Sequence, residues 1–175
     1  MIDNIVYDTR FNGNEWFVIA LIVVFFSAIR LFPRRFSPLQ ATFNFLIGIA
    51  FALLFDHTIG VPPFDLYDVG DQAKYQFFDL FSYLMYAPFG YWFMYGYERL
   101  RMFGWMTIVY ILVWTALGLG IETIGVRLGV YHYKNGYGAI YSIPIYALVM
   151  SLHLALYRAA FGRRRWRRRA SEGRG

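Results

Sequence analysis

Three carboxylates and one imidazole lie within, or at the ends of, long uncharged stretches of this sequence. They are Asp56, His57, Asp79 and Glu122. A carboxylate inside a bilayer is energetically costly unless it faces protein, water or a bound partner. Brought together, such groups could bind a hard divalent cation or exchange protons as general acid and base. All four are therefore candidate ligand or metal residues. Glu122 and Asp56 are the candidate catalytic residues, and a divalent cation is the only cofactor suggested.

Helical periodicity places two of these acids on stripes of small or polar residues. Small or polar residues recur at every fourth position up to Asp56. In the other stripe, Gly118 lies three residues after Thr115 and Glu122 lies four residues after Gly118. The first stripe consists of Asn44, Gly48, Ala52 and Asp56, and the second of Thr115, Gly118 and Glu122. Small residues let neighbouring helices approach closely. We therefore expect both acids to face the interior of a helix bundle.

The depth of each acid along its helix predicts where the acids meet. At ~1.5 Å per residue, Asp56 lies ~25 Å and Glu122 ~28 Å from the inner ends of their segments, and Asp79 lies within about two turns of the outer end. We expect the four candidates to gather near the outer surface, with Glu122 held by polar groups from residues 38–55 and 139–161. The alternative is that the acids only accept hydrogen bonds from some of the 15 tyrosines.

Two further polar residues are expected near the inner surface. Glu98 lies near the inner end of the third apolar segment, and His153 lies in the fifth, on a broad face with Tyr146 and Tyr157. Glu98 and His153 could form an inner polar pair. Alternatively, His153 is a neutral histidine that is hydrogen-bonded to another neighbour.

Composition places these residues in a membrane. The chain has 175 residues, 58% hydrophobic and only 16% charged, and its apolar residues form long uncharged runs. A soluble domain of this length needs more charge to cover its surface, whereas runs of about 20 apolar residues are typical of membrane-spanning helices. The expected spans are residues 16–32, 38–55, 75–97, 102–125 and 139–161. The sequence therefore predicts an all-α integral membrane bundle of five transmembrane helices, with one domain over 1–161 and a basic tail over 162–175.

The distribution of basic residues predicts the orientation of this bundle. All but four of the 17 lysines and arginines lie in the PRR and ERLR turns, beside them, or at the C-terminal end. The four exceptions are Arg10, Lys74, Arg127 and Lys134. Basic residues are retained in the cytoplasm. We therefore expect a multi-pass plasma-membrane protein with its N-terminus outside and its C-terminus inside.

The C-terminal tail RRRWRRR is the most specific local signal in the sequence. Its six arginines are Arg163, Arg164, Arg165, Arg167, Arg168 and Arg169. Directly after a membrane span, such a cluster should bind anionic lipid headgroups with about 1 kcal/mol per charge. We therefore expect anionic lipid, and not nucleic acid, to be the partner of this net charge of +6. The alternative is that the tail only enforces orientation.

Two other features of composition bear on function. The chain has no cysteine, which excludes disulfides, thiolate metal sites and a cysteine nucleophile. Aromatic residues make up 22% of the chain. Many lie near segment ends, where aromatic belts form at membrane interfaces. The alternative is an aromatic-lined site for a flat or long apolar ligand.

Three stretches of the sequence resemble a family of small polytopic membrane proteins from spore-forming Gram-positive bacteria. They are FDHTIGVPPFDLYDVGD, YLMYAPFGYWFMYGYERL and IETIGVRLGVYHYKNGYGAIYSIPIY. The resemblance extends over roughly two thirds of the chain. That family is uncharacterised, so the resemblance implies a membrane fold but no activity and no catalytic residue.

A weaker resemblance is to membrane-embedded carotenoid cyclases. In those enzymes a glutamate late in one span precedes a glycine-aromatic connection and a proline early in the next span. Glu122, the Tyr131–Tyr133 region and Pro144 follow this outline. The paired acidic residues that usually come after the proline are replaced here by Ile-Tyr-Ala. This resemblance implies an enzyme that acts on an isoprenoid.

Three functional hypotheses follow, and each predicts a different structure. A protein that binds lipid, a membrane-protein partner or a second copy of itself should expose a face rich in small residues. An enzyme acting on a lipid or isoprenoid, with Glu122 and Asp56 as proton donor and acceptor, should contain a lipid-sized aromatic cavity that reaches Glu122. A small ion or solute carrier should have a polar path from the outer acids to His153.

Overall fold

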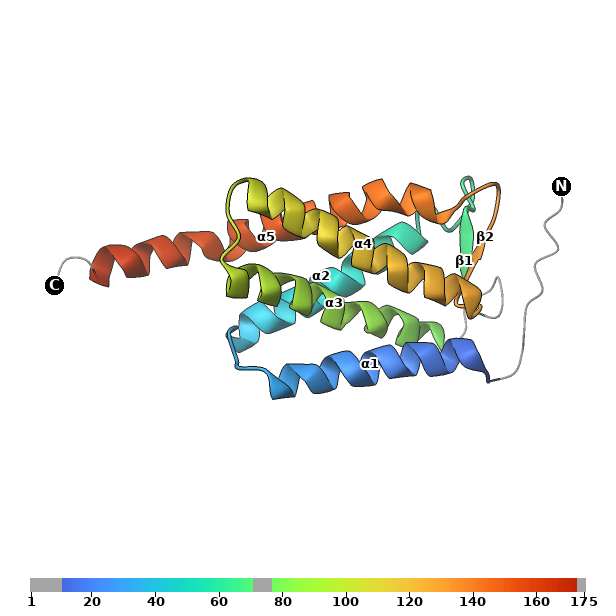
Figure 1. Ribbon diagram of the computed structural model, residues 1–175, viewed down its shortest axis with the longest axis horizontal. Helices are drawn as coiled ribbons and strands as arrows, with labels where there is room; N and C mark the ends of the chain where they lie inside the picture. The colour runs from blue at the N-terminus through green and yellow to red at the C-terminus, as the bar shows by residue number, and fades with distance from the viewer. Residues whose placement is uncertain (1–10, 71–76, 173–175) are drawn as a thin grey trace.

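The computed structural model describes the backbone of residues 11–70 and 77–172, and the side chains of residues 11–70 and 77–162. Within these residues the chain forms five helices and two short strands. Their order is α1 (Gly13–Leu31), α2 (Pro38–Asp56), β1 (Tyr67–Val69), α3 (Asp79–Leu100), α4 (Trp105–Arg127), β2 (Tyr131–Tyr133) and α5 (Ala139–Glu172). Successive helices run in opposite directions (Figure 1). The predicted all-α bundle is therefore confirmed, with a strand pair that the sequence analysis did not predict.

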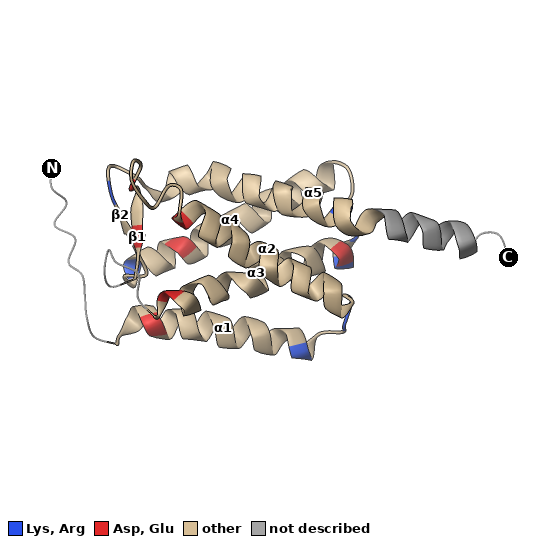
Figure 2. Cartoon of the chain, turned by 180° about the vertical axis from the view of Figure 1, so that it is seen from behind, with Lys and Arg blue, Asp and Glu red and all other residues tan. Residues whose placement is uncertain are grey.

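The two ends of the bundle differ. We call the end that carries β1 and β2 the strand end, and the end beyond which α5 extends the tail end (Figure 1). Acidic residues gather towards the strand end, whereas basic residues predominate at the tail end of the described bundle (Figure 2). The six arginines from Arg163 to Arg169 have side chains that lie outside the described part of the structure.

Local sequence signals explain where the helices begin and end. The first two helices each begin with a capping box: Asn12 and Glu15 cap the start of α1, and Ser37 and Gln40 cap the start of α2. Such boxes satisfy backbone N–H groups that have no partner within the helix. α3 ends at Leu100, and the C-cap residue Arg101 adopts a left-handed conformation. α4 therefore begins at Trp105 rather than at the expected residue 102.

Four of the described helices are long and apolar enough to cross a membrane. They are α1, α2, α4 and α5 as far as Gly162. Only 6–22% of the residues in their most apolar windows are buried inside the protein. Many of their large apolar side chains are exposed, such as Leu46 (59%) and Leu117 (53%), as expected for helices surrounded by lipid rather than water. Length and composition thus identify the chain as a multi-pass membrane protein.

α3 is the central helix of the bundle. Eleven of its 22 residues are buried, and it packs most extensively against α2 and then against α1. It is not among the four described helices that meet the length and hydropathy requirements for a span. Its buried residues include three tyrosines and the small residues Ser82, Ala87 and Gly90. It occupies the position of the third expected span.

Glycines allow α2 and α3 to approach closely. A Cβ atom built on Gly48 would collide with the backbone carbonyl of Tyr86, and one built on Gly90 would collide with the backbone carbonyl of Asn44. Asn44 is fully buried at this crossing. The stripe of small residues on α2 therefore faces α3, as the sequence pattern predicts.

The strand pair joins two connections that are far apart in the sequence. β1 and β2 are antiparallel, with Tyr67 opposite Tyr133, Asp68 opposite His132 and Val69 opposite Tyr131. Alternate side chains of a strand point to opposite faces. The tyrosines and Val69 line a cavity in the bundle, and Asp68 and His132 occupy the other face.

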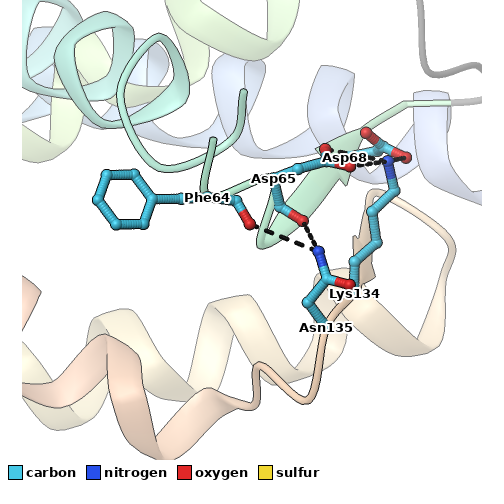
Figure 3. A network of polar contacts seen from close by, with 5 residues as sticks. All are labelled: Phe64, Asp65, Asp68, Lys134 and Asn135. Atoms are coloured by element: carbon cyan, nitrogen blue, oxygen red, sulfur yellow. Dashed lines mark hydrogen bonds and ion pairs between the residues drawn. The ribbon is translucent and has the colours of Figure 1, made fainter. Parts of the chain in front are cut away.

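Lys134 holds the two connections together at the strand end (Figure 3). Its ammonium group lies 2.6 Å from Asp68 Oδ2 and 3.2 Å from Asp65 Oδ1. The side-chain amide of Asn135 donates hydrogen bonds to the carbonyl oxygens of Asp65 (2.9 Å) and Phe64 (3.4 Å). Because Asp68 is only 8% exposed, this lysine neutralises a nearly buried charge.

Candidate functional site

A cavity of about 160 Å³ occupies the strand-end half of the bundle. α2 and α3 form one side of it, α4 and α5 form the other, and the strand pair contributes at the strand end. The two helix groups contact each other sparsely compared with the contacts inside each group, which leaves this space between them. An engineered protein cavity of about 150 Å³ binds benzene. The cavity is therefore large enough for one small ring or a few carbons of a chain.

Tyrosines are the most frequent residue type around this cavity. Among the described residues, seven form what we call the tyrosine cluster: Tyr67, Tyr83, Tyr86, Tyr131, Tyr133, Tyr137 and Tyr146. α3, both strands, the connection after β2 and the start of α5 contribute to it. The hydroxyl groups of Tyr86 and Tyr131 are hydrogen-bonded to each other, which ties α3 to β2.

Glu122 lies in the wall of the cavity with two differently placed carboxylate oxygens. Glu122 is only 7% exposed. Oε1 accepts hydrogen bonds from the hydroxyls of Tyr133 and Ser142, each at 2.6 Å. Tyr137 lies 2.9 Å from Ser142 Oγ and extends this network. Oε2 is buried and has no hydrogen-bond partner of normal geometry among the described residues, and the hydroxyl of Tyr146 on α5 is a further neighbour of this carboxylate.

These contacts bear on the expected surroundings of Glu122. Ser142 of α5 is one partner, which confirms that the expected segment 139–161 helps to hold this acid. The second partner, Tyr133, comes from β2 instead of the expected segment 38–55. The difference arises because the connection after α4 folds back as a strand, which brings Tyr133 over the end of the helix that carries Glu122.

Asp56 lines the same cavity from the last residue of α2. Its Oδ2 accepts a hydrogen bond from the hydroxyl of Tyr83 on α3. Each of the two cavity carboxylates is therefore paired with a tyrosine from a different element. This arrangement combines the two possibilities raised by the sequence, because the acids are hydrogen-bonded to tyrosines and also face a space that a ligand could occupy.

Electrostatic effects on the three strand tyrosines, Tyr67, Tyr131 and Tyr133, indicate that both carboxylates act on the same end of the cavity. Burial, followed by the charge of Asp56 and a smaller effect of Glu122, raises the pKa of Tyr67 above its usual range. Burial also raises the pKa of Tyr131, where the charges of Glu122 and Asp56 add to the increase. Burial and the hydrogen bond to Glu122 raise the pKa of Tyr133. These hydroxyls therefore keep their protons at neutral pH and act as donors.

His153 marks the far limit of the cavity. Its Nε2–H donates to Asn44 Oδ1 at 2.9 Å, and the residue is only 2% exposed. A Cβ atom on Gly90 would lie 3.1 Å from its ring. Glu98 lies eight residues further along α3, about 12 Å away along the helix. The structure thus pairs His153 with Asn44, and not with Glu98 as the sequence suggested.

His57 and Asp79 do not line the cavity with Asp56 and Glu122. His57 donates from Nδ1 to the carbonyl oxygen of Leu53 at 2.9 Å in an exposed position. Asp79 lines a separate cavity of about 20 Å³, between the start of α1 and the start of α3. Among the described residues, no group of three or more His, Cys, Asp or Glu side chains is arranged to hold a metal ion. The expected outer cluster is therefore divided between different places.

Sequence reasoning missed the partners that the strand pair supplies. The alternation in Tyr131–Tyr133 is a signal for a strand, but three residues are too few to distinguish a strand from a loop. Asn44 was placed on the small-residue stripe, yet its contact with His153 spans 109 positions in the sequence. No local pattern predicts a contact over that separation.

Known proteins give no independent guide to this site. Comparisons of the chain with protein-family models, with curated proteins and with solved structures found no match in any of the three.

Proposed function

We propose that this chain is a five-span plasma-membrane protein that binds a small apolar molecule, or one end of a lipid or isoprenoid, in the cavity between α2, α3, α4 and α5. The observation that carries the proposal is the cavity itself. Ligand sites are typically concave, largely apolar and furnished with a few polar groups that orient the ligand. Here aromatic and aliphatic side chains form most of the lining, and Asp56 and Glu122 are the acidic groups.

The topology we propose places the strand end outside and the tail end in the cytoplasm. It is supported by the basic residues at the tail end (Figure 2), since such residues are retained in the cytoplasm. In this proposal α3 is also a span and brings the total to five, because it runs the length of the bundle between its neighbours (Figure 1). The arginines from Arg163 to Arg169 would then lie at the inner leaflet and bind anionic headgroups.

Filling the cavity tests the binding proposal. Ala52 lines the cavity on α2, so Ala52→Phe should occupy part of the space that a ligand needs. Leu54 lies on the same helix and is 52% exposed, which makes Leu54→Phe the matched control. Both variants and the wild type would be purified from membranes in mild detergent, and the small molecules retained by each would be quantified by mass spectrometry.

The expected result is a molecule retained by the wild type and by Leu54→Phe but lost from Ala52→Phe. Equal retention by all three proteins, or no retained molecule in any of them, would contradict the proposal. Thermal unfolding of each variant shows whether the substitution has also disturbed the fold.

A membrane enzyme acting on an isoprenoid is a second candidate, favoured by the unpaired Oε2 of Glu122 beside the cavity. A protonated Glu122 would deliver its proton to a carbon–carbon double bond, and Asp56 would remove a proton from the resulting carbocation. The net result is an isomerised or cyclised alkene with no change in its formula. Carriage of an ion has less support, because apolar residues such as Ile145, Val149 and Met150 line the space between Glu122 and His153.

Product analysis separates the isoprenoid enzyme from the ligand-binding protein. Membranes containing the wild type would be incubated with isoprenoid alkenes, and the extracts examined for isomers of unchanged mass. A product that depends on Glu122, and disappears in Glu122→Gln but persists in Glu98→Gln, would favour the enzyme. Binding without conversion would favour a ligand-binding protein.

A further inference from the structure

We propose that the ligand of this cavity is an organic cation, a protonated amine that carries a small apolar group. The inference rests on the proposed function, because it assumes that the cavity between α2, α3, α4 and α5 is occupied. It goes further by assigning the chemical class of the occupant from the charge, the unpaired atom and the aromatic lining of the site.

The charges on the cavity wall are of one sign. Asp56 and Glu122 line the cavity, and no Lys or Arg of the described residues does so. Lys134 is paired with Asp65 and Asp68. His153 lies at the far limit and donates to Asn44. A buried carboxylate such as that of Glu122 normally has a paired counter-charge, and no lysine or arginine of the described residues supplies one at the cavity wall.

The hydrogen-bond donors at the two carboxylates are neutral hydroxyl groups. Tyr83 donates to Asp56, and both Tyr133 and Ser142 donate to Oε1 of Glu122. These hydroxyls supply hydrogen bonds but no positive charge. A cationic occupant would supply the charge that the described side chains around the two carboxylates lack.

Oε2 of Glu122 identifies the point at which the ligand would be held. It is the buried carboxylate oxygen with no partner among the residues described, and only 7% of Glu122 is exposed. An ammonium group donates up to three hydrogen bonds and carries the missing positive charge, so it satisfies both requirements at once. A neutral hydrocarbon satisfies neither.

The tyrosine cluster is suited to the rest of such a ligand. Aromatic rings attract cations through their electron-rich faces, and aromatic cages are a recurrent way of binding organic ammonium groups. The ring centre of Tyr137 lies 5.3 Å from that of Tyr133, in an edge contact, and 6.1 Å from that of Tyr67. Three of these rings are therefore grouped at the strand end near Glu122. The remaining space suits a ligand about the size of one aromatic ring.

Three probes of nearly equal size test the assignment. They are 2-phenylethylamine, which is cationic at pH 7; 2-phenylethanol, which is a neutral hydrogen-bond donor; and n-propylbenzene, which has no donor. Each would be titrated into the purified full-length protein in neutral detergent, with protein-free micelles as the blank. Sodium chloride would be titrated separately, because an alkali cation could also supply positive charge.

The expected result is that the amine binds at least about tenfold more tightly than the alcohol or the hydrocarbon, since a charge-assisted contact adds on the order of one power of ten. Glu122→Gln and Asp56→Asn should each weaken amine binding about tenfold or more. Glu98→Gln, at the tail end and outside the cavity lining, should leave it unchanged. The melting temperature of each variant is recorded to exclude unfolding.

Each other outcome overturns the inference in a recognisable way. Equal affinity for the three probes would leave a cavity that binds apolar molecules, as in the proposed function, but without recognition of charge. A response to sodium that depends on Glu122, in the absence of amine binding, would replace the organic cation by an alkali metal ion. Binding of no probe, together with equal retention of small molecules by Ala52→Phe and Leu54→Phe, would overturn the proposed function as well.

Discussion

Glu122 combines a structural and a reactive environment within one side chain. Oε1 accepts two hydrogen bonds of 2.6 Å, whereas Oε2 is buried without a partner among the described residues. The satisfied oxygen fixes the orientation of the carboxylate, because its donors come from β2 and α5. The unsatisfied oxygen is then held in a defined position at the cavity, which is the arrangement expected of a group that contacts a ligand.

The first prediction concerns the structural part of this side chain. Glu122→Gln keeps the shape and an oxygen acceptor, so its stability should be close to that of the wild type. Glu122→Leu leaves the hydroxyls of Tyr133 and Ser142 without their acceptor, and it should lower the free energy of unfolding by about 1–3 kcal/mol. Thermal unfolding in detergent measures both changes. Leucine as stable as the wild type would show that these hydrogen bonds do not hold the fold together.

The second prediction concerns His132 of β2. Burial lowers its pKa below the usual value of 6.5, although the charge of Asp68 acts in the opposite direction. Unfolding returns the imidazole to water, so the unfolded chain binds the proton more readily than the folded protein. Stability should therefore fall as the pH decreases below about 6.5.

His132→Gln tests this pH dependence, because glutamine has no titration in that range. We expect the melting temperature of the variant to decline less steeply than that of the wild type between pH 7 and pH 5. His57→Gln, at an exposed site of the same end, is the control. An unchanged slope in His132→Gln would assign the pH dependence to other groups.

At the scale of elements, the contact between α2 and α3 determines where the cavity forms. Gly48 and Gly90 bring the two helices together, with the pair of Asn44 and His153 beside the crossing. Towards the strand end, Ala52 and Asp56 of α2 line open space. The same stripe of small residues thus allows close packing against α3 at Gly48 and lines the cavity nearer the strand end, at Ala52 and Asp56.

The third prediction follows from this close approach. Gly48→Ala places a methyl group against the backbone of α3, which cannot move aside as a flexible side chain can. We expect the free energy of unfolding to decrease by about 1–3 kcal/mol, as for other overpacked sites. Gly120→Ala on α4 is the matched control, because no atom lies within 4 Å of the added carbon. That variant should be neutral or more stable by up to about 1 kcal/mol, since alanine favours helix.

The fourth prediction concerns the link between the two strand-end connections. Lys134→Met removes the ammonium group that lies beside Asp68 and Asp65, and leaves the nearly buried Asp68 without its cation. We expect a loss of about 1–3 kcal/mol and faster amide hydrogen exchange at β1 and β2. Asp65→Asn should have a smaller effect, because the Asp65 side chain is 38% exposed. Unchanged exchange at the strands in Lys134→Met would contradict this role.

At the scale of the whole molecule, the opposite charge of the two ends leads to the fifth prediction. A reporter fused after Gly175 should be cytoplasmic, and one fused before Met1 should be external, because the basic residues of the tail end favour the cytoplasm. Protease protection in intact cells measures both positions. Two termini on the same side would mean that one helix does not cross, and α3 is the described helix that does not meet the length and hydropathy requirements for a span.

The sequence predicts the helices of this molecule better than the contacts between them. Long uncharged runs locate α1, α2, α4 and α5, because a lipid environment imposes both length and composition. Stripes of small residues also predict which faces turn inward. The strand pair could not be predicted, since its register depends on residues about 64 positions apart, such as Asp68 and His132. The separation of Asp79 from Glu122 also depends on packing around α3, which depth along a helix does not describe.

The central position of α3 has a consequence for biogenesis. A translocon releases a segment into lipid according to its apolarity, and the tyrosine-rich α3 gains less from that transfer than its neighbours do. Its favourable surroundings are the glycine-bearing face of α2 and the side of α1, both of which are synthesised before it. On the five-span topology proposed here, α3 would leave the translocon as the second half of a hairpin with α2. The helices synthesised first would then provide a packing surface for α3, whose own apolarity favours insertion less.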